Sequence, residues 1–160
     1  MEYWILQGRL TDKSPAYHSP SGIPLNLDCW RIRYYAEEVN IGDIAFIWYP
    51  NPDRGIYNVS KVVSVPPHSV EYERQINTLW ESFRGYIDSD KFGMLSHYQA
   101  ILVEDQCLDD LQPPVLFEEL QQQGFGNLPV IRMARSGIYR LDQTVGERLL
   151  EYIQRTRRRS

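Results

Sequence analysis

The sequence predicts an α+β domain: a small, mixed and mostly antiparallel β-barrel with helices packed against its openings. Stretches with the alternating pattern of strands lie mainly before Pro66, whereas apolar residues at helical spacing follow mainly after it. A doubly wound sheet would instead alternate strands and helices along the whole chain. The 160 residues are enough for one hydrophobic core. We therefore expect a single domain over residues 1–155 and a basic tail over 156–160, frayed as charged termini usually are.

Composition is that of a globular protein and narrows the possible functions. Hydrophobic residues make up 42% of the chain and charged residues 24%. The chain has no long apolar run and no basic-then-apolar leader, so we expect a cytoplasmic protein with no membrane partner. Cys29 and Cys107 are far apart and are expected to be reduced thiols. The net charge of −4 means that any contact with nucleic acid has to come from a local patch.

A predicted strand and a predicted loop precede the stretch Cys29–Ser60, around which we expect the rest of the chain to be arranged. The apolar run Tyr3–Leu6 predicts a buried strand, and Gln7-Gly8 ends it. Prolines and small polar residues between Arg9 and Leu27 predict a long surface loop. The stretch Cys29–Ser60 then predicts three short strands joined by two tight turns. We expect it to form most of the barrel wall and one side of an aromatic pocket.

These three strands differ in their patterns. The segment Cys29–Tyr34 alternates apolar and charged residues, which is typical of a half-buried strand. Gly42 can adopt the positive φ of a turn and precedes Ile44–Tyr49, whose apolar run predicts a strand buried on both sides. A turn that ends at Gly55 leads to the alternating strand Ile56–Val65.

The second half of the chain predicts helices inserted between further strands. Helical spacing over Val70–Arg84 predicts an amphipathic helix, and Met94–Val103 is expected to be a strand. A short helix is expected from Pro113 to Gly124, with proline at its start and glycine at its end. The following segment predicts a loop and a short hairpin near Ser136-Gly137. Thr144-x-x-Glu147 predicts a capping box at the start of a C-terminal helix.

No arrangement of residues predicts catalysis or a metal site. The three histidines, His18, His68 and His97, lack the spacing of metal ligands, and the glycines form no phosphate loop. The acidic run Val103–Asp110 is expected to be a solvated loop rather than a calcium or magnesium site. We therefore expect no metal, no cofactor and no enzymatic activity.

The aromatic residues of Cys29–Ser60 leave two interpretations open. Tryptophan and tyrosine on strands usually fill a core or cover a sheet. Alternatively, two or three rings form a slot for a flat ligand such as a nucleobase, whose stacking contributes about 1–3 kcal/mol per base. Polar groups at the floor of such a slot would read the base edge.

The order of five stretches resembles the EVE domain family, which belongs to the PUA-like superfamily and is related to the YTH readers of methylated adenosine. These stretches are YWILQG, CWRIRYY, NIGDIAFIWYP, GIYNVSKVVSVP and LPVIRMARSGIYRL, and the resemblance covers Glu2 to Gln154. It implies a PUA-like pseudobarrel that binds a modified base in DNA or RNA. Gln7-Gly8 stands where many members have Lys-Ser, and Pro50 stands where many have a small polar residue.

The resemblance also implies the residues of the pocket. Trp30 and Trp48 would form stacking walls, Tyr49 would close the slot, and the Gln7 amide beside Gly8 would read the base edge. Asp43 is expected to be a turn residue and Trp4 a core residue. The candidates for contacts to flanking phosphates are Arg9, Lys13, Arg31, Arg33 and Arg132.

Three functions follow from these observations. The first is a nucleic-acid-binding module whose partner is DNA or RNA carrying a modified base, or a free nucleotide. The second is an enzyme that processes nucleotides or nucleosides in the same cavity, which would need a convergent acid, base or metal. The third is a protein-interaction scaffold, whose barrel would be closed and filled by apolar side chains.

Overall fold

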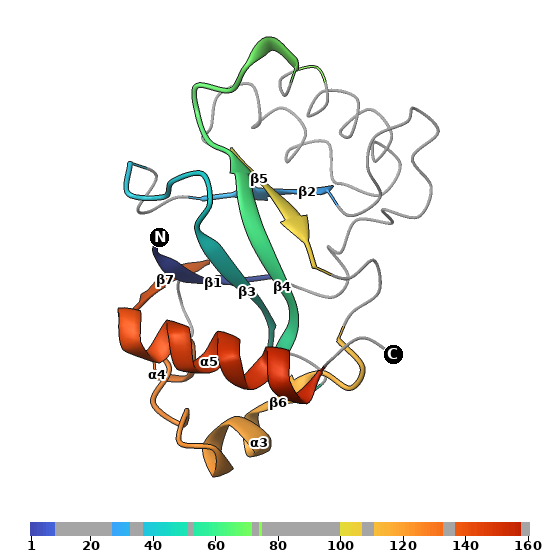
Figure 1. Ribbon diagram of the computed structural model, residues 1–160, viewed down its shortest axis with the longest axis vertical. Coiled ribbons are helices and arrows are strands. Elements are labelled where there is room, and N and C mark those ends of the chain that lie inside the picture. Colours follow the sequence, from blue (N-terminus) through green and yellow to red (C-terminus); the bar gives the residue numbers. More distant parts are fainter. Residues whose placement is uncertain are drawn as a thin grey trace.

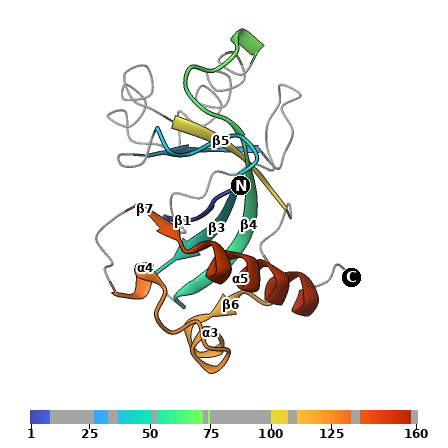
Figure 2. The same ribbon diagram turned by 60° about the vertical axis from the view of Figure 1, so that its left-hand side comes forward.

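In the computed structural model the labelled helices gather at one end of the molecule, and the longer strands lie across its middle (Figure 1 and Figure 2). The structure describes residues 1–8, 27–32, 37–50, 53–71, 74, 100–106, 111–132 and 137–157. Its strands are β1 (Tyr3–Gln7), β2 (Leu27–Arg31), β3 (Ile44–Tyr49), β4 (Gly55–Ser64), β5 (Ala100–Asp105), β6 (Val115–Leu116) and β7 (Ile138–Leu141). Its helices are α3 (Phe117–Gln122), α4 (Pro129–Arg132) and α5 (Gln143–Thr156).

All seven strands belong to one mixed sheet. The order is β2-β5-β4-β3-β1-β7, and β6 pairs with β4. The pair β1–β3 is parallel, whereas the other pairs are antiparallel. The prediction of an α+β fold with a mostly antiparallel sheet is therefore confirmed.

The stretch Cys29–Ser60 does not form a continuous part of this sheet. β3 and β4 are neighbours, as the tight turn between them predicts. β2, however, pairs with β5, and β3 pairs on its other side with β1. Three strands joined by tight turns would pair in chain order, so this expectation was wrong for β2. Its partner is a segment that lies far along the chain, and local patterns do not indicate such pairings.

The core consists of two clusters on opposite faces of the strands. The helix-side cluster includes Tyr3 and Ile5 of β1 and Phe46 of β3, which pack with side chains of α3 and α5. The strand-side cluster includes Trp4 and Leu6 of β1 with residues from the other long strands. Successive residues of a strand point to opposite faces, so β1 and β3 contribute to both clusters. The expectation that Ile44–Tyr49 is buried on both sides is confirmed.

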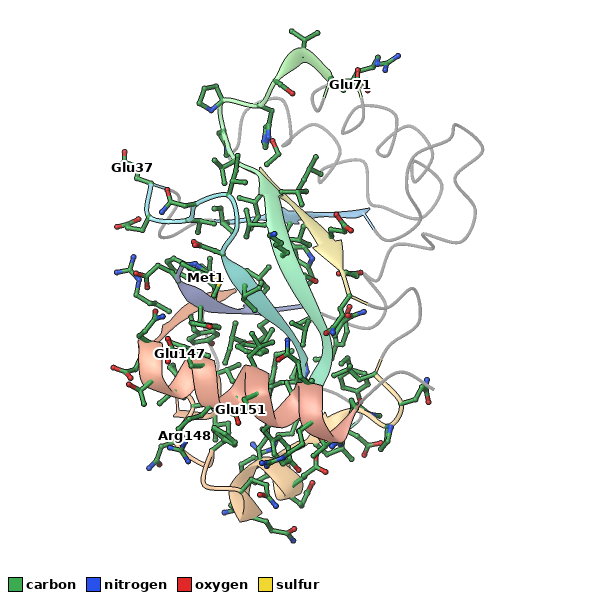
Figure 3. All side chains as sticks on the ribbon, viewed as in Figure 1. Met1, Glu37, Glu71, Glu147, Arg148 and Glu151 are labelled. Carbon is green, nitrogen blue, oxygen red and sulfur yellow. The ribbon has the colours of Figure 1, made fainter. Side chains whose placement is uncertain are left out.

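Helix α5 covers the helix-side cluster. Its buried residues are Gly146, Leu149, Tyr152 and Ile153. The charged side chains of Glu147, Arg148 and Glu151, labelled in Figure 3, lie at exposed positions of the helix. The helix begins earlier than the sequence suggested. The N-cap is Asp142, whose carboxylate accepts a hydrogen bond from the N–H of Thr144. The predicted capping box at Thr144 is therefore wrong, although the helix itself is confirmed.

Other local predictions had mixed outcomes. Gly42 and Gly124 adopt φ of +96° and +86°, as the turn and helix end predicted for them require. The segment before β7 contains helix α4 instead of a hairpin, and β7 pairs with β1. That expectation was wrong because the strand's partner lies at the other end of the chain. Most of the residues for which a surface loop was predicted before Leu27, and most of those for which a helix was predicted over Val70–Arg84, lie outside the described residues.

The C-terminal end of α5 is anchored rather than frayed. The guanidinium of Arg157 donates hydrogen bonds to the carbonyls of Pro113 and Pro114 and forms a 2.6 Å ion pair with Glu119. Its side chain is only 7% exposed. The expected basic tail therefore contributes at least this residue to the folded body, because Glu119 of α3, 38 residues earlier, supplies its partner.

A close contact between α5 and β1 leads to the first prediction. A Cβ on Gly146 would lie 2.2 Å from the Tyr3 ring. Burial raises the pKa of the Tyr3 hydroxyl, and the nearby Glu147 carboxylate raises it further. Gly146→Ala should lower the free energy of unfolding by about 1–2 kcal/mol, because overpacking outweighs the gain in helix propensity. Urea unfolding measures this change, and equal or greater stability would contradict the close packing of α5 on β1.

Candidate ligand site at Gly8 and Trp30

The indole of Trp30 rests on the backbone at the end of β1. The N–H of Gly8 donates a 3.0 Å hydrogen bond to the carbonyl of Trp48, so Gly8 continues the pairing of β1 with β3. A Cβ on Gly8 would lie 2.6 Å from Cη2 and 2.9 Å from Cζ3 of Trp30, and 3.5 Å from Cε1 of Tyr49. Real Cβ atoms essentially never approach so closely. Glycine is therefore required at this position for the indole to lie where it does.

Two tyrosines complete this group of rings. Tyr49 and Tyr57 meet edge to face, with ring centroids 5.2 Å apart and an interplanar angle of 74°. The hydroxyl of Tyr57 donates a 2.6 Å hydrogen bond to the carbonyl of Asp53, which fixes this ring. Tyr49 is buried, whereas Tyr57 and Trp30 are partly exposed. We call Trp30, Tyr49 and Tyr57 the aromatic cluster.

The indole nitrogen of Trp30 is a buried donor. Its Nε1 atom is covered but has no hydrogen-bond partner within the part of the chain that the structure describes. Nε1 of Trp4, in contrast, donates a 2.9 Å hydrogen bond to Asp43. Leaving a buried donor unpaired costs about 1–3 kcal/mol, and such groups are uncommon in folded proteins. The aromatic cluster thus carries a local cost that packing alone does not explain.

The other two predicted pocket residues lie on the opposite face of the strands. Oε1 of Gln7 accepts a 3.1 Å hydrogen bond from the hydroxyl of Tyr139, which belongs to the helix-side cluster. Trp48 is 2% exposed and belongs to that cluster as well. The structure therefore brings Gly8, Trp30 and Tyr49 together, and it places the side chains of Gln7 and Trp48 elsewhere.

Strand alternation accounts for this division. Gln7 and Gly8 are consecutive, as are Trp48 and Tyr49, so the members of each pair must point to opposite faces of an extended strand. The sequence contained this signal. Tyr57 and Tyr139 were not singled out as site residues, and only their partners across the sheet distinguish them from the other tyrosines of the chain.

The predicted phosphate contacts are only partly visible. Arg31 ends β2 opposite Ala100, and Arg132 is the last residue of α4. Arg9, Lys13 and Arg33 lie outside the described residues. Among the residues that are described, no group of three or more His, Cys, Asp or Glu side chains could hold a metal ion. No described helix is long and apolar enough to cross a membrane.

Asp43 and Trp4 have the structural roles expected of them. The buried carboxylate of Asp43 accepts hydrogen bonds from the N–H groups of Glu2 and Asn40 and from the indole of Trp4, each 2.9 Å long. Trp4 is 1% exposed. These contacts join the N-terminus to the turn before β3, and so they position the start of β1 relative to the sheet.

Solved structures with the same fold provide a comparison. A hypothetical protein from Leishmania major superposes with a TM-score of 0.62 at 13% identity, over 99% of this chain and 98% of that one. Human THYN1 in complex with DNA containing 5-methylcytosine superposes with a TM-score of 0.58 at 14% identity, over 100% and 99% of the two chains. The DUF55 domain of human thymocyte nuclear protein 1 gives 0.56 at 15% identity, over 94% and 97%.

These likenesses concern the fold. They confirm the prediction of a mixed sheet with flanking helices, an arrangement that this chain shares with those proteins over nearly its whole length. No protein-family model and no curated protein matches the sequence.

Proposed function

We propose that this chain is a nucleic-acid-binding module of the EVE type, in which Trp30 stacks on a modified base of DNA or RNA. The observation that carries the proposal is the partial exposure of Trp30 beside Gly8, since Trp4 and Trp48 are 1% and 2% exposed. A ring can stack on a base only if one face is accessible. The shared fold with human THYN1, solved with DNA containing 5-methylcytosine, supports the same class of ligand.

The other proposed site residues act around this ring. Tyr49 and Tyr57 hold the position of the aromatic cluster through their edge-to-face contact. Gln7 and Trp48 contribute from the opposite face: the Trp48 carbonyl holds Gly8, and Tyr139 orients the Gln7 amide. In this proposal they position the end of β1 and do not touch the base.

The net charge of the protein indicates how much of the affinity for nucleic acid comes from phosphate contacts and how much from base contacts. With a net charge of −4, few phosphates can be neutralised, and contacts to the base have to supply much of the affinity. The proposed phosphate contacts are Arg9, Arg31, Arg33 and Arg132. If all four neutralise phosphates of a duplex, affinity should fall on the order of 100-fold between about 50 and 200 mM salt, since the slope on a logarithmic plot is about −0.9 per neutralised phosphate.

Binding to labelled oligonucleotides tests the proposal. Fluorescence anisotropy at two stated salt concentrations compares single- and double-stranded DNA and RNA with cytosine or 5-methylcytosine at one position. Trp30→Ala should weaken binding about tenfold or more, because stacking contributes about 1–3 kcal/mol per base. If the unmutated protein binds none of these oligonucleotides, or if folded Trp30→Ala binds equally well, the proposal fails.

A conservative change at the buried tryptophan is the matched control. Trp48→Phe removes part of a side chain in the helix-side cluster, so it should lower stability and leave affinity within about twofold at temperatures where the variant is folded. Circular dichroism melting curves of both variants establish that they are folded under the conditions of the binding measurement.

A further inference from the structure

The indole N–H of Trp30 distinguishes the aromatic cluster from ordinary core packing. Trp30 packs against the strand-side cluster and lies opposite Ile101 of β5. Its Nε1 atom is buried and has no hydrogen-bond partner among the described residues. A phenylalanine or leucine would fill such a place without leaving a donor unpaired. The N–H of Trp30 is therefore a buried donor for which no described residue supplies an acceptor.

Trp4 shows how the same fold treats an indole whose role is structural. It belongs to the strand-side cluster as well, and its N–H is paired with the buried carboxylate of Asp43. The Asp43 carboxylate also accepts hydrogen bonds from the backbone N–H groups of Glu2 and Asn40. The indole of Trp4 thus has an acceptor for its N–H, whereas the indole of Trp30, beside Gly8, has none among the described residues.

We propose that the N–H of Trp30 donates a hydrogen bond to a neutral acceptor, either a carbonyl oxygen or a ring nitrogen, on the nucleotide beside the stacked base, because the N–H lies in the plane of the indole and points away from a base on its face. This inference rests on the proposed function and names the group that the site recognises. A charged acceptor such as phosphate fits poorly, because the surrounding strand-side side chains are mainly apolar and would not compensate its desolvation.

The burial of Nε1 implies an adjustment on binding. The acceptor can reach the nitrogen only if the indole or the side chains that cover it shift, and changes of side-chain rotamer at binding surfaces are common. The edge of the indole that touches Gly8 is the six-membered ring. Nε1 belongs to the five-membered ring at the opposite edge of the indole, so a shift of that edge need not displace the edge beside Gly8.

An isosteric replacement separates the N–H from the ring. β-(3-Benzothienyl)alanine, incorporated at position 30 by codon suppression, keeps the two fused rings and replaces the N–H by sulfur. We expect about tenfold weaker binding of the preferred oligonucleotide and a melting temperature that is unchanged or higher. Trp30→Phe should show the same direction with a larger loss of affinity, because its ring is also smaller.

The two proposals fail in different ways. If the unmutated protein binds and Trp30→Ala does not, but the benzothienyl protein binds as tightly as the unmutated one, stacking is correct and the hydrogen bond is refuted. If the unmutated protein binds no oligonucleotide, the proposed function itself fails and the inference falls with it. A lower melting temperature of the benzothienyl protein would show that the N–H already has a partner in the free protein, which also refutes the inference.

The indole signals in a ¹⁵N–¹H spectrum provide a direct readout. The Trp30 signal is the one absent from Trp30→Phe, and it should shift and exchange more slowly with water when the oligonucleotide is added. Inorganic phosphate alone should leave it unchanged. Trp4→Phe is the control: it removes a paired N–H, so it should lower stability while the Trp30 signal still responds to the oligonucleotide. A Trp30 signal that does not respond at saturation would overturn the proposal.

Discussion

Replacing Asp43 by alanine should lower the free energy of unfolding by about 3–5 kcal/mol, since each unpaired buried donor costs about 1–3 kcal/mol. The Asp43 carboxylate is 2% exposed and accepts three hydrogen bonds. The alanine variant would leave the indole of Trp4 and the N–H groups of Glu2 and Asn40 without their acceptor. The total stability of a domain is commonly 5–15 kcal/mol, so the loss is a large fraction of it.

A graded series tests this assignment. Asp43→Asn keeps one carbonyl oxygen, which can serve the two donors that share Oδ2, but its amide group faces the donor that used Oδ1. Its loss should lie between zero and that of alanine. Asp142→Ala removes the N-cap of α5 and should cost only about 1 kcal/mol. Urea unfolding with fluorescence and circular dichroism detects all three changes, and an Asp43→Ala loss no greater than that of Asp142→Ala would refute the central role of this carboxylate.

The fold could be predicted as far as its signals are local. The apolar run of β3, the positive φ of Gly42 and the presence of a C-terminal helix depend on neighbours in sequence, and each was predicted correctly. The pairing of β2 with β5 and of β1 with both β3 and β7 depends on residues far apart in the chain. Those choices arise from the packing of two core clusters, which no single stretch of sequence specifies.

The residues of the candidate site could also be predicted only in part. Trp30 and Gly8 were predicted from a resemblance, and the structure places them in contact. Trp48 was assigned to the same slot by the same resemblance, although strand alternation puts it on the other face with Phe46. That no described residue accepts a hydrogen bond from the indole of Trp30 could not be predicted at all. Whether a donor has a partner depends on three-dimensional packing. The face that a strand residue occupies, in contrast, follows from its place in the alternation along the strand.

Gly8→Ala should impair both stability and binding, because it places an atom where the Trp30 ring lies. The added Cβ would be 2.6 Å from Cη2 and 2.9 Å from Cζ3, so the indole has to move or β1 has to shift. Overpacking of this kind costs about 1–3 kcal/mol. Displacement of the stacking ring should weaken binding of the preferred oligonucleotide by about tenfold or more. Loss of affinity should exceed that expected from the unfolded fraction alone, because the change acts on the ring itself.

Gly137→Ala is the matched control for this prediction. Gly137 lies beside the same end of β1, where its carbonyl accepts the N–H of Gln7, but a Cβ on it would meet nothing within 4 Å. The control should keep stability and affinity close to those of the unmutated protein. Fluorescence of Trp30 in a protein whose other tryptophans are phenylalanine would follow the displaced ring, provided that this background remains folded and binds. If Gly8→Ala binds as Gly137→Ala does, the indole beside Gly8 is not the surface on which the base stacks, and the aromatic cluster is core.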